Sequence, residues 1–114
     1  MPNMLSPAKR RITYTEFSDV FDQINQLASR TRTDRSSVLR QATQEFVLAL
    51  KRKTWKPAEY EKPASPAASI KRVSYAEWLD VADVLLSFAH DNRQDLSAVV
   101  RKAVYTYLVN QRRK

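Results

Sequence analysis

Two short stretches of this 114-residue chain carry outward positions at every second residue, and all but one of these positions hold a hydrogen-bonding side chain. The positions are Arg11, Thr13 and Thr15 in the first stretch, and Arg72, Ser74 and Ala76 in the second. Arginine presents a planar fork of N–H donors, and the hydroxyls of threonine and serine both donate and accept. Side chains of these types suit hydrogen bonding to the polar edges of nucleic-acid bases.

The overall charge also indicates a polyanionic partner. The chain has 20 Lys and Arg residues against 12 Asp and Glu residues, which gives a net charge of +8 and a pI near 10.0. An excess of this kind favours nucleic acid or an acidic membrane surface as the partner. Lys9, Arg10 and Lys71 border the alternating stretches, and we expect them to contact phosphates.

Composition excludes several classes of enzyme and cofactor site. The chain has no Gly and no Cys, which removes Gly-rich phosphate loops and thiolate metal sites. Its one histidine, His90, cannot form a histidine cluster, and we expect it to be a solvated residue near a helix end. Tyr14 and Tyr75 are candidate nucleophiles for DNA cutting, but their alternation places them on a core face. We therefore expect a binding protein without catalytic residues, metal or cofactor.

No apolar run approaches 18 residues, and no long apolar stretch follows the N-terminal charges. We therefore expect a cytoplasmic protein that does not span a membrane. Hydrophobic residues make up 43% of the chain, which is enough to form a core.

The chain contains an internal repeat. Residues 11–53 and 72–114 align without a gap at an offset of 61, and 15 of the 43 aligned positions are identical. This match predicts a tandem duplication, with repeats over 9–53 and 70–114 that form one intertwined domain. Residues 54–69 contain three prolines and several Ala and Ser, which predicts an extended connector, and residues 1–8 are expected to be a flexible tail.

Each repeat is expected to begin with a strand. Ile12 and Tyr14 alternate with polar residues from residue 9 to about residue 15, and Val73 and Tyr75 do the same in the second copy. A competing interpretation exists, because Thr13 and Glu16 have the spacing of a capping box, as do Ser74 and Glu77. A helix could then begin as early as residue 14 or 75, although we favour the strand.

Two helices are expected to follow each strand. Apolar residues recur at helical spacing over 17–28 and 78–89, at positions Phe17, Val20, Phe21, Ile24, Leu27 and Ala28, and Trp78, Val81, Leu85, Phe88 and Ala89. Asp34 and Asp95 are good N-caps for the second helix of each repeat. Those helices are expected to bury Val38, Leu39, Ala42 and Phe46, and Val99, Val100, Ala103 and Tyr107. Both end in basic clusters, 51–53 and 112–114, which suit a helix C-terminus.

A strand with two helices, about 45 residues long, is too small to bury its own core, and a lone strand leaves its backbone unpaired. Both problems disappear if the repeats pair. The sequence therefore predicts a mostly α fold in which a two-stranded antiparallel ribbon covers four helices, as a single-chain pseudo-dimer. A two-stranded ribbon fits the major groove of DNA, where its outward side chains would contact bases.

The segments LASRTRTDRSSVLRQA (27–42) and FAHDNRQDLSAVVRKA (88–103) resemble the ribbon-helix-helix DNA-binding family of Arc-type and MetJ-type repressors. The resemblance implies double-stranded DNA as the partner. It also implies that the start of the second helix binds a backbone phosphate, through Arg35 and Ser36 in one repeat and Leu96 and Ser97 in the other. The family usually carries Gly in the turn between the helices, where this chain has Arg32 and Arg93.

Tandem copies in one chain are similar to TraY-type relaxosome proteins and to the VirC-operon group that assists T-DNA transfer. This similarity implies a bacterial accessory factor in DNA transfer that works beside other DNA-processing proteins. Two alternatives stay open: a transcriptional repressor or antitoxin with the same fold, and a basic helical adaptor that binds an acidic protein or a membrane.

The two repeats are not equivalent. Thr15 corresponds to Ala76 and Arg35 to Leu96, and residues 1–57 carry 11 basic and 5 acidic groups (+6) against 9 and 7 (+2) in residues 58–114. We therefore expect the protein to act as a monomer that reads an asymmetric or imperfectly repeated DNA site.

Overall fold

The computed structural model describes residues 8–59 and 70–112, which form two strands and four helices. In chain order these are β1 (Lys9–Phe17), α1 (Ser18–Arg30), α2 (Arg35–Lys51), β2 (Ile70–Trp78), α3 (Leu79–Asp91) and α4 (Leu96–Arg112). The succession of strand, helix and helix occurs twice, with 9, 13 and 17 residues each time. The predicted mostly helical fold with one pair of strands is confirmed.

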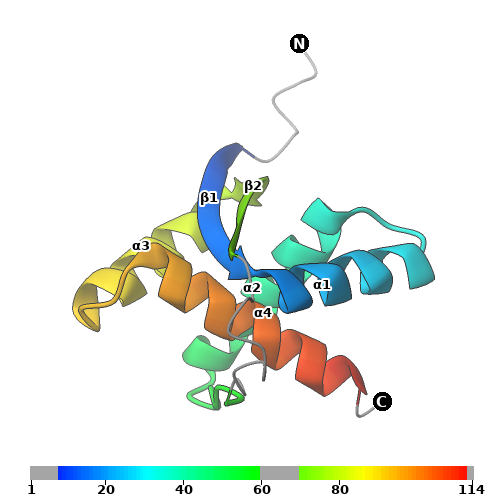
Figure 1. Cartoon of the computed structure of the whole chain (residues 1–114). Helices are drawn as coiled ribbons and strands as arrows, with labels where there is room; N and C mark the ends of the chain where they lie inside the picture. Colours follow the sequence, from blue (N-terminus) through cyan, green and yellow to red (C-terminus); the bar gives the residue numbers. More distant parts are fainter. Residues whose placement is uncertain (1–7, 60–69, 113–114) are drawn as a thin grey trace.

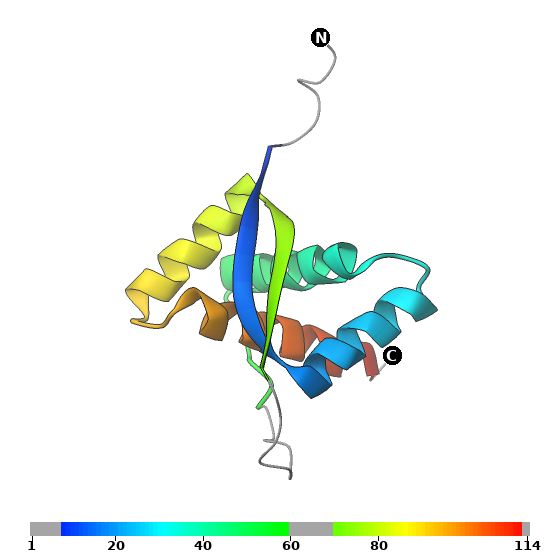
Figure 2. The same ribbon diagram turned by 45° about the horizontal axis from the view of Figure 1, so that its top comes forward.

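The two strands pair in antiparallel fashion and form a ribbon on one side of the helices. Thr13 lies opposite Ser74 at the centre, and Lys9 and Phe17 lie opposite Trp78 and Ile70 at the two ends. The ribbon rises from the layer that contains α2 and α4, with α1 and α3 on opposite flanks (Figure 1). A tilted view shows both strands crossing in front of α2 and α4 (Figure 2).

The inner face of the ribbon forms the top of the core. Ile12, Tyr14, Val73 and Tyr75 are all buried, whereas Thr13 between them is exposed. The rings of Tyr14 and Tyr75 meet edge to face at 6.4 Å between centroids, which is a favourable aromatic geometry. The predicted alternation of buried and outward residues is thereby confirmed, and with it the placement of both tyrosines on the core face.

The helices bury the faces that the 3.6-residue spacing predicts, with a few half-buried exceptions. The predicted positions that are buried are Val20, Ile24, Leu27, Ala28, Val38, Leu39, Ala42, Phe46, Val81, Leu85, Ala89, Val99, Val100 and Ala103. Phe21, Phe88 and Tyr107 are only half-buried against this core. Tyr107 borders an open groove of about 390 Å³ between α2 and α4. Its counterpart Phe46 lines the same groove but is buried, with the Trp55 ring packed edge to face on it at 4.6 Å between centroids.

Both strands run two residues further than the sequence predicted, and neither capping box forms. Phe17 and Trp78 end the strands, in extended backbone and without a side-chain cap for the helix that follows. The Glu16 carboxylate instead accepts hydrogen bonds from the Tyr14 hydroxyl and the Phe17 amide. The first helix of each repeat begins only at Ser18 and at Leu79, so the interpretation in which a helix begins near residue 14 or 75 is wrong.

The turns between helices place a non-glycine residue in the left-handed region. Arg32 has φ 58° and Arg93 has φ 53°, a conformation that costs an L-residue about 1 kcal/mol. Side chains just before the turn support it: the Thr31 hydroxyl donates to Leu27 O at 2.8 Å, and Asn92 Nδ2 donates to Phe88 O at 2.8 Å. The arginines therefore adopt the conformation for which the resembling family uses glycine.

The first part of the connector packs onto the helices. The Ala58 amide donates to Thr106 Oγ1 of α4 at 2.9 Å, and Trp55 packs on Phe46 of α2. The predicted N-terminal tail up to residue 7, the rest of the connector (60–69) and residues 113–114 lie outside the described residues.

Candidate nucleic-acid interface

The six side chains predicted to contact bases lie together on the outer face of the ribbon. In register, Arg11 is opposite Ala76, Thr13 opposite Ser74 and Thr15 opposite Arg72. Five of the six are exposed and Thr15 is half-buried. Strand alternation is the cause, since residues two apart point to the same side. This face therefore combines two guanidinium groups, three hydroxyls and the methyl groups of Thr13, Thr15 and Ala76.

The cations predicted to contact phosphate sit at the two ends of the ribbon. Lys9, Arg10 and Lys71 are all exposed. The Lys9 ammonium lies 4.6 Å from the centroid of the Trp78 ring on the other strand, which holds this cation against the ribbon end. Arg10 and Lys71 are the cross-strand neighbours of Glu77 and Glu16.

The second helix of each repeat begins with an aspartate cap, as predicted. Asp34 Oδ1 accepts from the Ser37 amide at 2.8 Å, and Asp95 Oδ1 accepts from the Ala98 amide at 2.7 Å. The Ser37 hydrogen bond holds the pKa of Asp34 below its usual value. The amides of Arg35 and the following residue remain without an intrahelical partner, which leaves them available to a phosphate oxygen, although the nearby carboxylate opposes an anion.

Two predicted phosphate-contacting residues have other contacts as well. The Arg35 side chain turns back over α1, where Nε donates to Asn25 Oδ1 at 3.0 Å and the guanidinium lies 4.6 Å from the Phe21 ring centroid. Ser97 Oγ at the start of α4 accepts from the Thr15 amide at 3.0 Å. This bond joins the start of α4 directly to β1. Ser36, the counterpart of Ser97, is half-buried at the start of α2.

The structure adds two arginines for which the sequence analysis gave no role. Arg101 of α4 donates to the Thr15 carbonyl oxygen, and Arg40 of α2 donates to the Ala76 carbonyl oxygen, both at 2.9 Å. Each guanidinium also lies over an aromatic ring at the end of the same strand, Phe17 and Trp78 respectively. Each strand is thus bound to the longer helix of the other repeat. Arg40 and Arg101 occupy aligned positions of the two repeats, and this identity was the one sign in the sequence that they share a role.

The sequence also did not predict that two carboxyl groups are buried under the ribbon. Glu16 and Glu77 are 1% and 0% exposed, and burial raises the pKa of both, to about 7 for Glu16. Glu77 accepts from the hydroxyls of Thr43 and Tyr75 at 2.5 and 2.7 Å. Burial also raises the pKa of Tyr14 and Tyr75. The hydrogen bonds among these four side chains and Thr43 offset the cost of burying polar groups, so a structural role is sufficient to explain them.

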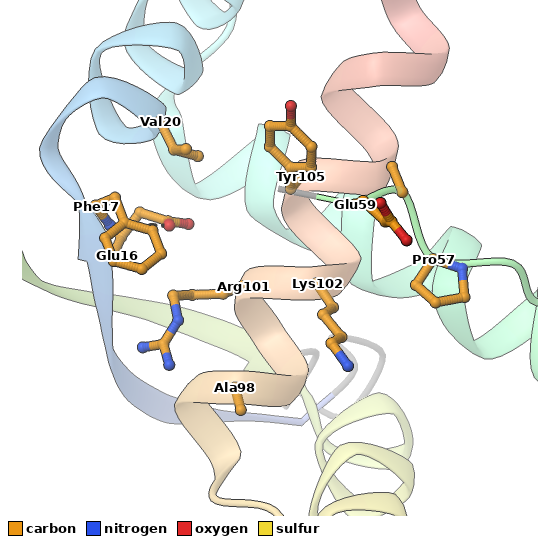
Figure 3. Close-up of a pocket in the computed structure, with 10 residues that line it drawn as sticks. Glu16, Phe17, Val20, Pro57, Glu59, Ala98, Arg101, Lys102 and Tyr105 are labelled. Carbon is orange, nitrogen blue, oxygen red and sulfur yellow. Dashed lines mark hydrogen bonds between the residues drawn. The ribbon is translucent and has the colours of Figure 1, made fainter. Parts of the chain in front are cut away.

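An open pocket of about 600 Å³ lies beside the end of β1, between that strand, α4 and the first part of the connector. Figure 3 shows Phe17 and Val20 on one side, Arg101 and Lys102 of α4 in the middle, and Pro57 of the connector opposite. The pocket joins polar and apolar groups from both repeats.

Among residues 8–59 and 70–112, no three His, Asp or Glu side chains are grouped as a metal-ion site. The side chain of His90 is 90% exposed at the end of α3, with Nδ1 3.6 Å from Asp91 Oδ1, as predicted. In the part of the chain that the structure describes, no helix is long and apolar enough to cross a bilayer. No family model, curated protein or solved structure matches the chain.

Proposed function

We propose that this chain is a single-chain pseudo-dimer of the ribbon-helix-helix type that binds double-stranded DNA in the major groove. The register of the ribbon supports the pseudo-dimer. Thr13 lies opposite Ser74, and Ser74 is also the residue that aligns with Thr13 in the second repeat, at the offset of 61. An axis through this pair would exchange β1 with β2, and the equal lengths of the two sets of elements fit that exchange.

The observation that carries the proposal is the outer face of the ribbon. A two-stranded ribbon has the width to enter the major groove, in which each base pair presents its own pattern of donors and acceptors. Arg11 and Arg72 can each pair with guanine O6 and N7, and the hydroxyls of Thr13, Ser74 and Thr15 can reach other base edges. The net charge of +8 supports association with the phosphate backbone.

The adaptor alternative receives less support. A membrane-binding amphipathic helix uses its apolar face for the lipid, whereas the apolar faces of α1, α2, α3 and α4 are buried against one another and against the ribbon. By resemblance, we place the protein among accessory factors of DNA transfer. A repressor of the same fold would use the same face, and the location of the bound DNA sequence, at a transfer origin or at a promoter, separates the two roles.

The test is selection of bound duplexes from a random DNA pool, followed by footprinting of the selected sequence. We expect one site of two unlike halves, bound much more tightly than random duplex. Flotation with anionic liposomes serves as the parallel measurement. Equal retention of all duplexes, or binding to liposomes in place of DNA, would overturn the proposal. Recovery of perfect palindromes alone would overturn the narrower prediction that the two halves of the site differ.

A further inference from the structure

We propose that Arg101 is a positioning residue that orients the hydroxyl of Thr15 toward the DNA, so that one half of the site is read with an additional hydrogen bond. The inference rests on the proposed binding of DNA through the ribbon. It concerns which base edges are recognised in each half, and why the halves differ.

The geometry around Thr15 fixes this side chain from three sides. Arg101 Nη1 donates to the Thr15 carbonyl oxygen at 2.9 Å and to Thr15 Oγ1 at 2.8 Å. The Thr15 amide donates to Ser97 Oγ at 3.0 Å. The guanidinium is itself held over the Phe17 ring, 5.4 Å from its centroid. Thr15 is thus bound through its amide, its carbonyl and its side chain, all to α4.

The same position in the other repeat lacks this arrangement. Arg40, the counterpart of Arg101, donates through Nη1 to the Ala76 carbonyl oxygen at 2.9 Å and lies over Trp78 at 5.9 Å. Its position relative to the strand is equivalent, but Ala76 offers no hydroxyl to hold. The pair of arginines therefore provides an internal comparison, in which both bind a strand carbonyl and lie over an aromatic ring, but only Arg101 also hydrogen-bonds an outward side chain.

The chemistry of the hydroxyl decides what it can recognise. A threonine hydroxyl has one hydrogen and two lone pairs. Because Arg101 occupies one of these lone pairs, the hydrogen is directed away from the guanidinium and is available as a donor. One lone pair remains, but the positive charge of the adjacent guanidinium opposes the approach of a base amino group to it. A donor in the major groove matches guanine O6 or N7, adenine N7 or thymine O4, and does not match the amino groups of adenine or cytosine.

The strand register places the Thr15 hydroxyl beside Arg72 and away from Arg11. Thr15 lies opposite Arg72, whereas Arg11 lies opposite Ala76. The half-site read by Arg72 therefore has a second required acceptor beside it, and the half-site read by Arg11 meets a methyl group at the equivalent place. We infer that the preferred DNA has an acceptor-bearing base in one half at a position where the other half tolerates any base.

The decisive experiment compares Arg101→Lys with Arg40→Lys, both of which keep the positive charge. Binding is measured to the selected duplex and to duplexes with each base pair of each half replaced. We expect Arg101→Lys to reduce base discrimination at one position of the Arg72 half by up to about tenfold, as expected for one hydrogen bond. Arg40→Lys should leave discrimination unchanged in both halves.

Two further variants keep the test decisive if the lysine variant unfolds. Thr15→Val should lose the same discrimination, and adding Arg101→Lys to it should remove nothing more. Ala76→Thr places a hydroxyl beside Arg40 and should shift selected sites toward a palindrome. Thermal unfolding of every variant checks that it folds.

Equal weakening of all duplexes by Arg101→Lys and Arg40→Lys would leave Arg101 with a structural role only and overturn the inference. Unchanged site symmetry in Ala76→Thr would also overturn it. Both results leave the proposed function intact, since wild-type selectivity tests that function by itself. A wild-type protein that selects no duplex would overturn both proposals.

Discussion

Thr13 of β1 and Ser74 of β2 face each other at the centre of the ribbon, with their hydroxyl oxygens 2.8 Å apart. Either hydroxyl can be the donor, but only one hydrogen lies between the two oxygens. The pair therefore presents one free O–H to a bound molecule instead of two. The centre of the outer face is thus chemically unsymmetrical even though the two residues occupy equivalent positions.

Ser74→Ala removes this bond and frees the Thr13 hydroxyl in both of its roles. Because the pair is exposed, we expect the free energy of unfolding to fall by less than about 1 kcal/mol. Base preference should change at the centre of the selected site and stay the same toward its ends. Urea unfolding and binding to a panel of substituted duplexes measure the two effects, and a uniform loss over all duplexes would contradict the central role.

Arg11→Ala and Arg72→Ala should each weaken specific binding by about 1–3 kcal/mol and relax preference at one base position. Lys9→Ala is the matched control at the ribbon end. Its loss should be equal for all duplexes and should lower the slope of log affinity against log salt by about 1. Titrations at several salt concentrations measure both quantities, and a uniform loss for the arginine variants would reassign them to phosphate contacts.

Protein stability should fall as pH rises from about 4.5 to about 7. Burial raises the pKa of Glu16 from 4.5 to about 7, so within this window the folded state keeps a proton that the unfolded chain has released. The stabilisation lost over the window is about 3 kcal/mol. Denaturant unfolding at a series of pH values measures it. Glu16→Gln, in which the side chain stays neutral, should flatten this dependence; an unchanged profile would assign the effect to other groups.

Thr43→Val should destabilise the fold by about 1–3 kcal/mol, because it removes a hydrogen bond to the buried Glu77 carboxyl group. This bond lowers the pKa of Glu77 against the effect of burial, which means that it favours the charged carboxylate. The free energy of unfolding should therefore fall more at pH 8 than at pH 5 when the bond is removed. Val104, the buried counterpart of Thr43 on α4, allows the converse change. Val104→Thr should lower the pKa of Glu16, and a Thr43→Val variant as stable as wild type at both pH values would refute the prediction.

Arg32→Gly should leave the protein equally stable or stabilise it by up to about 1 kcal/mol. Arg32 has φ 58°, where glycine has no steric penalty. Arg30→Gly, two residues earlier at the end of α1, is the control and should destabilise by about 1 kcal/mol, since glycine disfavours helix. Thermal and urea unfolding measure both variants, and a clear loss of stability in Arg32→Gly would mean that the arginine side chain holds the turn.

Local periodicity was sufficient to predict the elements and their buried faces. Alternation about Tyr14, helical spacing through Ile24 and the capping aspartate at Asp34 follow from interactions within a few residues, so the sequence encodes them directly. The repeat then predicted that the strands pair, because a single repeat cannot bury its core. The outer face with Arg11 and Thr13 followed from the same alternation.

Tertiary packing decided where the strands end and what holds them. Glu16 has the spacing from Thr13 that a capping box requires. In the structure its carboxyl group is buried beneath the ribbon, where it accepts hydrogen bonds from the Tyr14 hydroxyl and the Phe17 amide. The contacts of Arg101 with Thr15 and of Thr43 with Glu77 join residues 86 and 34 positions apart. No pattern within one segment specifies such contacts, because they depend on how β1 lies across α4 and how β2 lies across α2.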